Sequence, residues 1–277
     1  MRNIMKWTAI VLGGLIGLAL LTGAALYPSG MEKLTRSYPN IPVETVNIPT
    51  DPDAIARGKH ASIIWACTKC HGEDLSGTLI THDPIEGSIP ILGTIPASNL
   101  TSGNGGVGQS YTDTDWVRAI RHGVEPDGQV EIIMYDYSTM GDQDLGDLIA
   151  YLKQIPPVDT NYPEIHYGPV IPIAPAIGIF TPVAELIDHN APHPTDPNPD
   201  ATIEYGKYLS AICAGCHGNS IARVVEKWNQ EEFILTFNTG VLPDGRQLGP
   251  TMSSNTFREM NDMELAALWL YFMDAKP

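Results

Sequence analysis

The sequence predicts an all-α protein in which two similar helical modules follow one N-terminal membrane helix. Three observations predict it: an uncharged apolar run near the N-terminus, a C-x-x-C-H motif that occurs twice, and a segment of helical periodicity after each motif. A chain of 277 residues has room for two small domains. We expect an anchor and juxtamembrane linker at residues 1–50, modules at 51–157 and 200–277, and a proline-rich linker at 158–199.

The apolar run is long enough to cross a membrane. Arg2 and Lys6 precede Trp7–Leu26, which contains no charged residue. At ~1.5 Å per residue this run spans ~30 Å, the thickness of the hydrocarbon layer. Basic residues before it place the N-terminus in the cytoplasm and the modules on the outer, periplasmic side of a bacterial membrane. A cleaved signal peptide is the alternative, with Gly23–Ala25 as a small-residue site, but the length favours an uncleaved anchor.

The four cysteines all lie in two motifs, Cys67-Thr-Lys-Cys70-His71 and Cys213-Ala-Gly-Cys216-His217. C-x-x-C-H is the attachment signature of a c-type haem, in which two thiols add to the porphyrin vinyl groups and the imidazole ligates the iron. Zinc, a thioredoxin-like redox pair and disulfides are the alternatives, but none of them explains a histidine at the same place in both motifs. We therefore predict two covalently bound haems, with His71 and His217 as iron ligands.

Helices open and close each module in the same order. The opening helices start near Asp53 and Thr202, and the closing helices cover Asp144–Lys153 and Glu264–Phe272, where apolar residues recur at i, i+3, i+4 and i+7. Each opening helix contains a glycine, Gly58 or Gly206. Glycine weakens a helix by ~1 kcal/mol relative to alanine, so we expect the closing helix to approach the backbone closely there.

Methionines supply candidates for the sixth iron ligand. Met134 and Met252 each follow a Pro-Asp-Gly turn and are the predicted ligands. Met140 and Met260 are alternatives, but they precede the closing helices and suit core positions better. A distal histidine is a further alternative, with His122 the first candidate. The others are His60, His82, His166, His189 and His193.

The net charge of −16 excludes a basic nucleic-acid-binding surface. It suits solubility, or docking to a basic partner such as a soluble cytochrome. The sequence contains no catalytic triad, phosphate loop or nucleotide-binding motif, so we expect no catalytic residues and a carrier rather than an enzyme.

The sequence resembles the membrane-anchored dihaem cytochromes c and is similar to the cytochrome subunits of bacterial membrane-bound alcohol and gluconate dehydrogenases. The resemblance covers nearly the whole chain. It rests on the anchor, on CTKCHGEDLSG, on Asn99-Leu-Thr101, on YTDTDWVRAIRHGVEPDG and on Gly249-Pro-Thr-Met252. It implies two tandem class I cytochrome c domains, with Met134 and Met252 as axial ligands. It also implies that Asn99 and Thr101 contact the haem propionates.

The resemblance implies electron transfer in a respiratory chain, between a membrane or periplasmic donor and an oxidase or carrier. The expected partners are a membrane dehydrogenase, a quinol oxidoreductase, a terminal oxidase or a soluble cytochrome. Two other functions remain open. One is a dihaem enzyme of the peroxidase or thiosulfate-oxidising type, which needs an iron with an open site. The other is a structural subunit whose haems connect parts of a larger complex.

Overall fold

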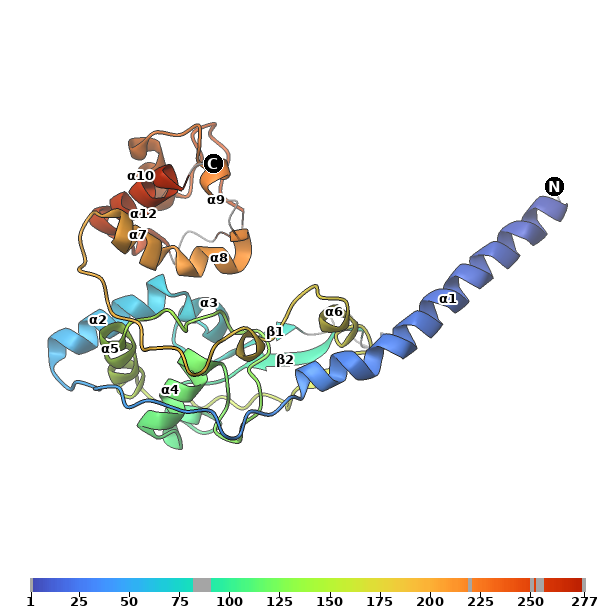
Figure 1. Cartoon of the computed structure of the whole chain (residues 1–277), viewed down its shortest axis with the longest axis horizontal. Helices are drawn as coiled ribbons and strands as arrows, with labels where there is room; N and C mark the ends of the chain where they lie inside the picture. The colour runs from blue at the N-terminus through green and yellow to red at the C-terminus, as the bar shows by residue number, and fades with distance from the viewer. Residues whose placement is uncertain (1, 82–90, 219–220, 250–251, 253–256, 276–277) are drawn as a thin grey trace.

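The computed structural model describes the chain apart from residues 1, 82–90, 219–220, 250–251, 253–256 and 276–277 (Figure 1). Helices form most of the regular structure. They are α1 (Arg2–Leu34), α2 (Pro52–Ile64), α3 (Cys67–His71), α4 (Asp113–His122), α5 (Asp142–Leu152), α6 (Ile173–Ala176), α7 (Ile203–Leu209), α8 (Ala211–His217), α9 (Ile221–Val224), α10 (Gln230–Thr239) and α12 (Asp262–Asp274), with 3-10 turns η1 (Val107–Gln109) and η2 (Val183–Glu185).

Helix α1 projects away from the rest of the molecule (Figure 1). It is the one helix among the described residues that is long and apolar enough to cross a membrane. Its 33 residues correspond to ~50 Å at ~1.5 Å per residue, so it extends beyond a hydrocarbon layer. Most of its side chains are exposed.

The opening and closing helices of both modules cross at their glycines, as the sequence predicts. A Cβ on Gly58 would lie 1.9 Å from the Asp147 carbonyl oxygen in α5. A Cβ on Gly206 would lie 1.9 Å from the Ala267 carbonyl oxygen in α12. The same crossing therefore occurs twice, and a side chain at either position would push the helices apart.

Side-chain caps fix where these helices begin. Asp51 accepts a hydrogen bond from the Ala54 amide at the start of α2, and Thr202 caps α7 in the same way. Capping boxes start α4, α10 and α12, and the one at α12 pairs Asn261 with Glu264 as the sequence predicts.

The all-α prediction is incomplete, because a small antiparallel sheet accompanies the helices. It has the order β1 (Thr78–Thr81), β2 (Gly93–Ala97), β3 (His166–Tyr167). The first two strands lie between the first motif and α4, and the third lies in the predicted linker. Pairing of Thr94 with His166 thus ties the linker to the first module.

The predicted juxtamembrane linker also follows the surface of the first module. The Tyr38 amide donates to the Gly128 carbonyl at 2.7 Å, and the Glu44 carboxylate contacts both Arg121 and His122 at the end of α4. The juxtamembrane linker and the linker between the modules are therefore both hydrogen-bonded to the first module. The proposed domain limits themselves stay predictions.

The two modules touch through polar and aromatic contacts. The Tyr208 hydroxyl on α7 donates to the Asp144 carboxylate on α5 at 2.6 Å, and the Tyr208 ring lies 5.3 Å from the Trp65 ring. His60 Nε2 lies 2.7 Å from a carboxylate oxygen of Glu264 in the second module. One buried hydrophobic cluster runs through both modules.

Candidate haem-binding site

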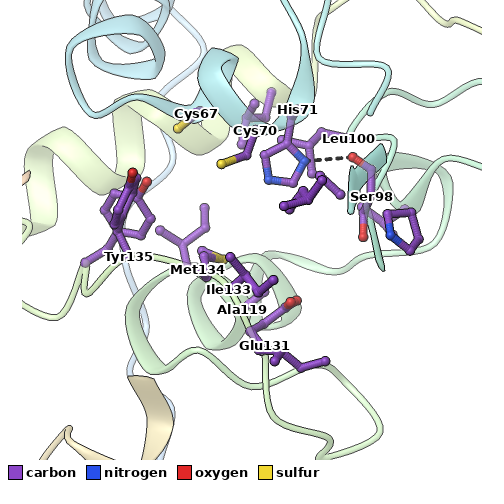
Figure 2. A pocket seen from close by; sticks show the side chains of 18 of the residues that line it. Cys67, Cys70, His71, Ser98, Leu100, Ala119, Glu131, Ile133, Met134 and Tyr135 are labelled. Carbon is purple, nitrogen blue, oxygen red and sulfur yellow. Dashed lines mark hydrogen bonds between the residues drawn. The ribbon is translucent and has the colours of Figure 1, made fainter. Parts of the chain in front are cut away.

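A cavity that is partly open to solvent lies beside the first motif (Figure 2). Helices α3, α4 and α5, strand β2 and the loop at 131–137 provide its walls. Most of the lining is apolar, with Leu100, Ile120, Leu148 and Leu152 among the contributors. A partly open cavity with an apolar lining and a few polar groups is typical of a site for an organic ligand.

The first motif lies on a single turn of helix at the cavity wall. Ala66 adopts a left-handed conformation, with φ of 60°, and α3 starts directly after it. Cys67 and Cys70 are three residues apart, so both thiols lie on one side of that turn and at the cavity. Burial raises the pKa of the Cys67 thiol to about 12. The Cys67 sulfur thus lies in apolar surroundings, and both cysteines line the cavity.

The His71 ring is oriented by a hydrogen bond to the backbone. Its Nδ1–H donates to the Ser98 carbonyl at 2.7 Å (Figure 2). This bond leaves Nε2 as the nitrogen able to ligate a metal. Burial lowers the pKa of His71, against the smaller opposite effect of the Ser98 carbonyl. The neutral imidazole, which is the ligating form, is therefore favoured.

Met134 lies across the cavity from His71 (Figure 2). The loop that carries it follows the turn at Gly128 and passes beneath the first motif. Met140, the alternative ligand, is fully buried in the hydrophobic core and does not line the cavity. The geometry therefore favours Met134 as the partner of His71.

The second motif brings a similar pair together. His217 ends α8, and its Nε2 lies 3.4 Å from the sulfur of Met252. Met260 is buried at 3% exposure in the hydrophobic core, as Met140 is in the first module. Cys213 is half-buried, whereas the side chain of Cys216 lies outside the described part of the structure. The nitrogen and sulfur that would ligate iron therefore face each other here too.

Trp116 is a site residue that the sequence analysis left unassigned. Its ring lines the cavity, and its indole Nε1–H is buried without a hydrogen-bond partner in the structure. Leaving a buried donor without an acceptor costs free energy of folding. An oxygen atom of a bound ligand would supply the missing acceptor. The apolar lining, two thiols, an imidazole and this donor together fit a haem group.

Asn99 and Thr101 do not line the cavity, although Leu100 between them does. The Asn99 amide donates to the Val158 carbonyl at 2.8 Å, and its oxygen accepts from the Thr101 amide. The Thr101 hydroxyl accepts from the Val158 amide at 3.0 Å. Both side chains hold the chain after the closing helix, so their proposed contact with propionates stays a prediction.

The alternative histidine ligands lie elsewhere in the described structure. His122 bonds to Glu44 and His189, and His193 approaches Asp142. His60 contacts the second module and His166 lies in β3. None of them lines the cavity beside His71, and His82 lies outside the described residues.

The arrangement agrees with the similarity of the chain to a characterised protein. Over 189 residues the chain is 29% identical to the fructose dehydrogenase cytochrome subunit of Gluconobacter japonicus. The chain is similar to the cytochrome subunit of a dehydrogenase. This confirms the resemblance found in the sequence, and it agrees with an electron-transfer component rather than a catalytic one.

The similarity is partial. The match covers 61% of this chain and 37% of the relative, so the chain spans little more than a third of that protein's length. The chain matches no protein-family model.

Proposed function

We propose that the chain is a dihaem c-type cytochrome that transfers electrons for a membrane dehydrogenase. One haem would be bound by Cys67, Cys70 and His71, with Met134 on its other side. The second would be bound by Cys213, Cys216 and His217, with Met252 opposite. When bound, each haem supplies a one-electron redox couple.

The observation that carries this proposal is the geometry around the first motif. Two thiols and an oriented imidazole lie on one wall of an apolar cavity, and a thioether lies on the other. Thioether ligation raises the potential of haem iron and leaves no position for a substrate. These residues therefore favour electron transfer over the peroxidase-like alternative.

Contact between the modules supports a relay through both. The Tyr135 ring, next to Met134, lies against Gly215 inside the second motif, where a Cβ would be 2.7 Å from the ring. Helix α8 lies across from α3 in Figure 1. A side chain beside one predicted iron ligand thus touches the attachment turn of the other haem, which makes a short path between the two.

The proposed location is the outer face of the bacterial cytoplasmic membrane. Helix α1 would anchor the chain, and the basic residues Arg2 and Lys6 favour a cytoplasmic N-terminus. The relative is named as a subunit of a fructose dehydrogenase, and we propose that this chain likewise accepts electrons from a dehydrogenase. It would pass them to an oxidase or another carrier.

Absorption spectroscopy of purified holoprotein tests the proposal. Two haems per chain are expected by the pyridine haemochrome assay, and the band of the methionine–iron bond should be present in the oxidised protein. Met134→Leu and Met252→Leu should each remove about half of this band, and the double variant should remove it all, because each methionine ligates one iron.

Met140→Leu and Met260→Leu are matched controls, because these methionines are buried in the core. Both controls should keep the full band. Loss of the band in a control, or carbon monoxide binding by the untreated wild-type protein, would overturn the ligand assignment and favour an enzyme.

A further inference from the structure

The linker between the modules contains a stretch without acidic or basic residues, from Tyr167 to Ala184. We call it the α6 loop. It lies against the end of α1 that is nearest the modules (Figure 1). A Cβ on Gly23 would lie 3.4 Å from the Ile173 side chain, and a Cβ on Gly30 would lie 1.6 Å from the Pro172 carbonyl oxygen. Small residues allow this close packing against a membrane helix.

The contact lies at the end of the uncharged run, where α1 would leave the hydrocarbon layer. Trp7–Leu26 is the uncharged run of ~30 Å, and Gly23 lies in its last turn. Gly30 lies about two turns further on, just before the charged residues Glu32 and Lys33. The α6 loop therefore extends across the outer boundary of the layer, alongside the helix.

The α6 loop exposes apolar side chains at this level. Ile177 is 54% exposed and Ile179 is 72% exposed. Both lie directly after α6, on a stretch with no charged side chain to keep it in water. Lipid at the interface would cover them favourably.

Several backbone amides of the α6 loop are hydrogen-bonded within the loop, as a segment in low-polarity surroundings requires. The amides of Ile173, Ala174, Ile177 and Ile179 donate to carbonyls within the loop. Pro172 and Pro175 have no amide hydrogen to satisfy. Internal hydrogen bonding is what a segment needs when it enters the boundary between headgroups and acyl chains.

An ion pair closes the far end of the loop. Arg36, just after α1, lies 3.1 Å from Glu185, the first charged residue after the loop. The loop thus packs against α1 at Gly23 and Gly30, and the ion pair joins the two segments just beyond them. Its exposed tip cannot turn away from the membrane without breaking these contacts.

We propose that the α6 loop inserts its tip, Ile177–Ile179, into the outer interface of the membrane that α1 spans. This inference rests on the proposed anchor role of α1. The occupant of the exposed apolar tip is lipid. The loop gives the first module a second membrane contact and fixes its height above the bilayer.

Photocrosslinking in phospholipid nanodiscs tests the proposal with the full-length holoprotein. A diazirine amino acid replaces Ile177, Ile179, Leu12 or Leu235 in turn, and the nanodisc contains clickable phosphatidylcholine. Leu12 lies in α1 and is the positive control, whereas Leu235 lies on α10 with a similar exposure of 58%. Positions 177 and 179 should be labelled about tenfold more than position 235.

Each other outcome has a definite meaning. Labelling of position 12 with only background at 177 and 179, or crosslinks from the tip to a second protein chain, would overturn the inference and leave the anchor intact. Background labelling at position 12 as well would overturn the anchor and the inference together. Gly30→Leu should displace the loop, reduce labelling at 177 and 179, and leave labelling at 12 unchanged.

Discussion

Replacing a crossing glycine by alanine tests the helix packing, because helix propensity and packing predict opposite effects on stability. In an isolated helix, Gly58→Ala should stabilise by ~1 kcal/mol. In the fold, the new Cβ would lie 1.9 Å from the Asp147 carbonyl oxygen, whereas real Cβ atoms essentially never come within 3.0 Å of another heavy atom. Helices α2 and α5 must therefore separate by about 1 Å.

The expected result is a net loss of stability. Overpacking of this kind costs about 2–3 kcal/mol, and the gain in helix propensity offsets about 1 kcal/mol of it. A net loss of about 1–2 kcal/mol corresponds to a fall in apparent melting temperature of about 3–6 °C for a chain of this size. Gly206→Ala should behave in the same way, because its geometry with Ala267 is the same.

Thermal unfolding followed by far-ultraviolet circular dichroism measures the change. Lys59→Ala is the matched control, since Lys59 is an exposed neighbour in α2 and its replacement tests propensity alone. A melting temperature that is unchanged or raised by Gly58→Ala would refute the crossing geometry. The separation of α5 should also disturb the cavity wall, because Leu148 and Leu152 belong to both.

Three further predictions concern the site and the contact between modules. Asn99→Ala should lower the free energy of unfolding by about 1–3 kcal/mol in denaturant titrations, with haem content unchanged. It leaves the buried Thr101 amide without an acceptor and removes one of the two side-chain donors to the Val158 carbonyl. A stable variant with an altered redox potential would instead indicate a propionate contact. The Glu264 carboxylate raises the pKa of His60 above its unfolded value of about 6.5, so the stabilisation is complete below about pH 6.5 and is lost as pH rises through the folded pKa. The melting temperature of the wild type should fall as pH rises through this range, and His60→Gln should abolish this pH dependence. The same pH dependence in His60→Gln as in the wild type would contradict the assignment. Tyr135→Ala should slow electron exchange between the modules, measured by flash photolysis, whereas Tyr135→Phe should preserve the rate. The same exchange rate in both variants would exclude this contact as the route.

Local signals made much of the fold predictable from the sequence. The capping box at Asn261 and the apolar spacing in the closing helices depend on neighbours within a few residues. The crossing glycines were predictable because a glycine inside a helix is unfavourable unless another backbone lies close to it. The haem motifs were readable because their chemistry requires fixed spacing.

Contacts between distant segments could not be read in this way. Strand β3 is two residues long and pairs with β2 across more than seventy positions, so no periodicity marks it. Asn99 carries a signal typical of a ligand contact, but its partner in the structure is Val158, far along the chain. The Trp116 nitrogen becomes informative only when the cavity shows that it is buried and unpaired.

The bonded segment between α1 and α2 has a consequence for how the protein would meet its partners. A free tether over residues 35–50 would let the modules wander by about 20–24 Å. Instead, the backbone bond between Tyr38 and Gly128 and the contacts of Glu44 with Arg121 remove that swing. With α1 spanning the membrane as proposed, the protein would diffuse within the plane of the bilayer and present one face at a fixed height above it. A redox partner would then have to present its own redox centre at the height of that face, and the membrane plane would restrict the orientations in which the two proteins meet.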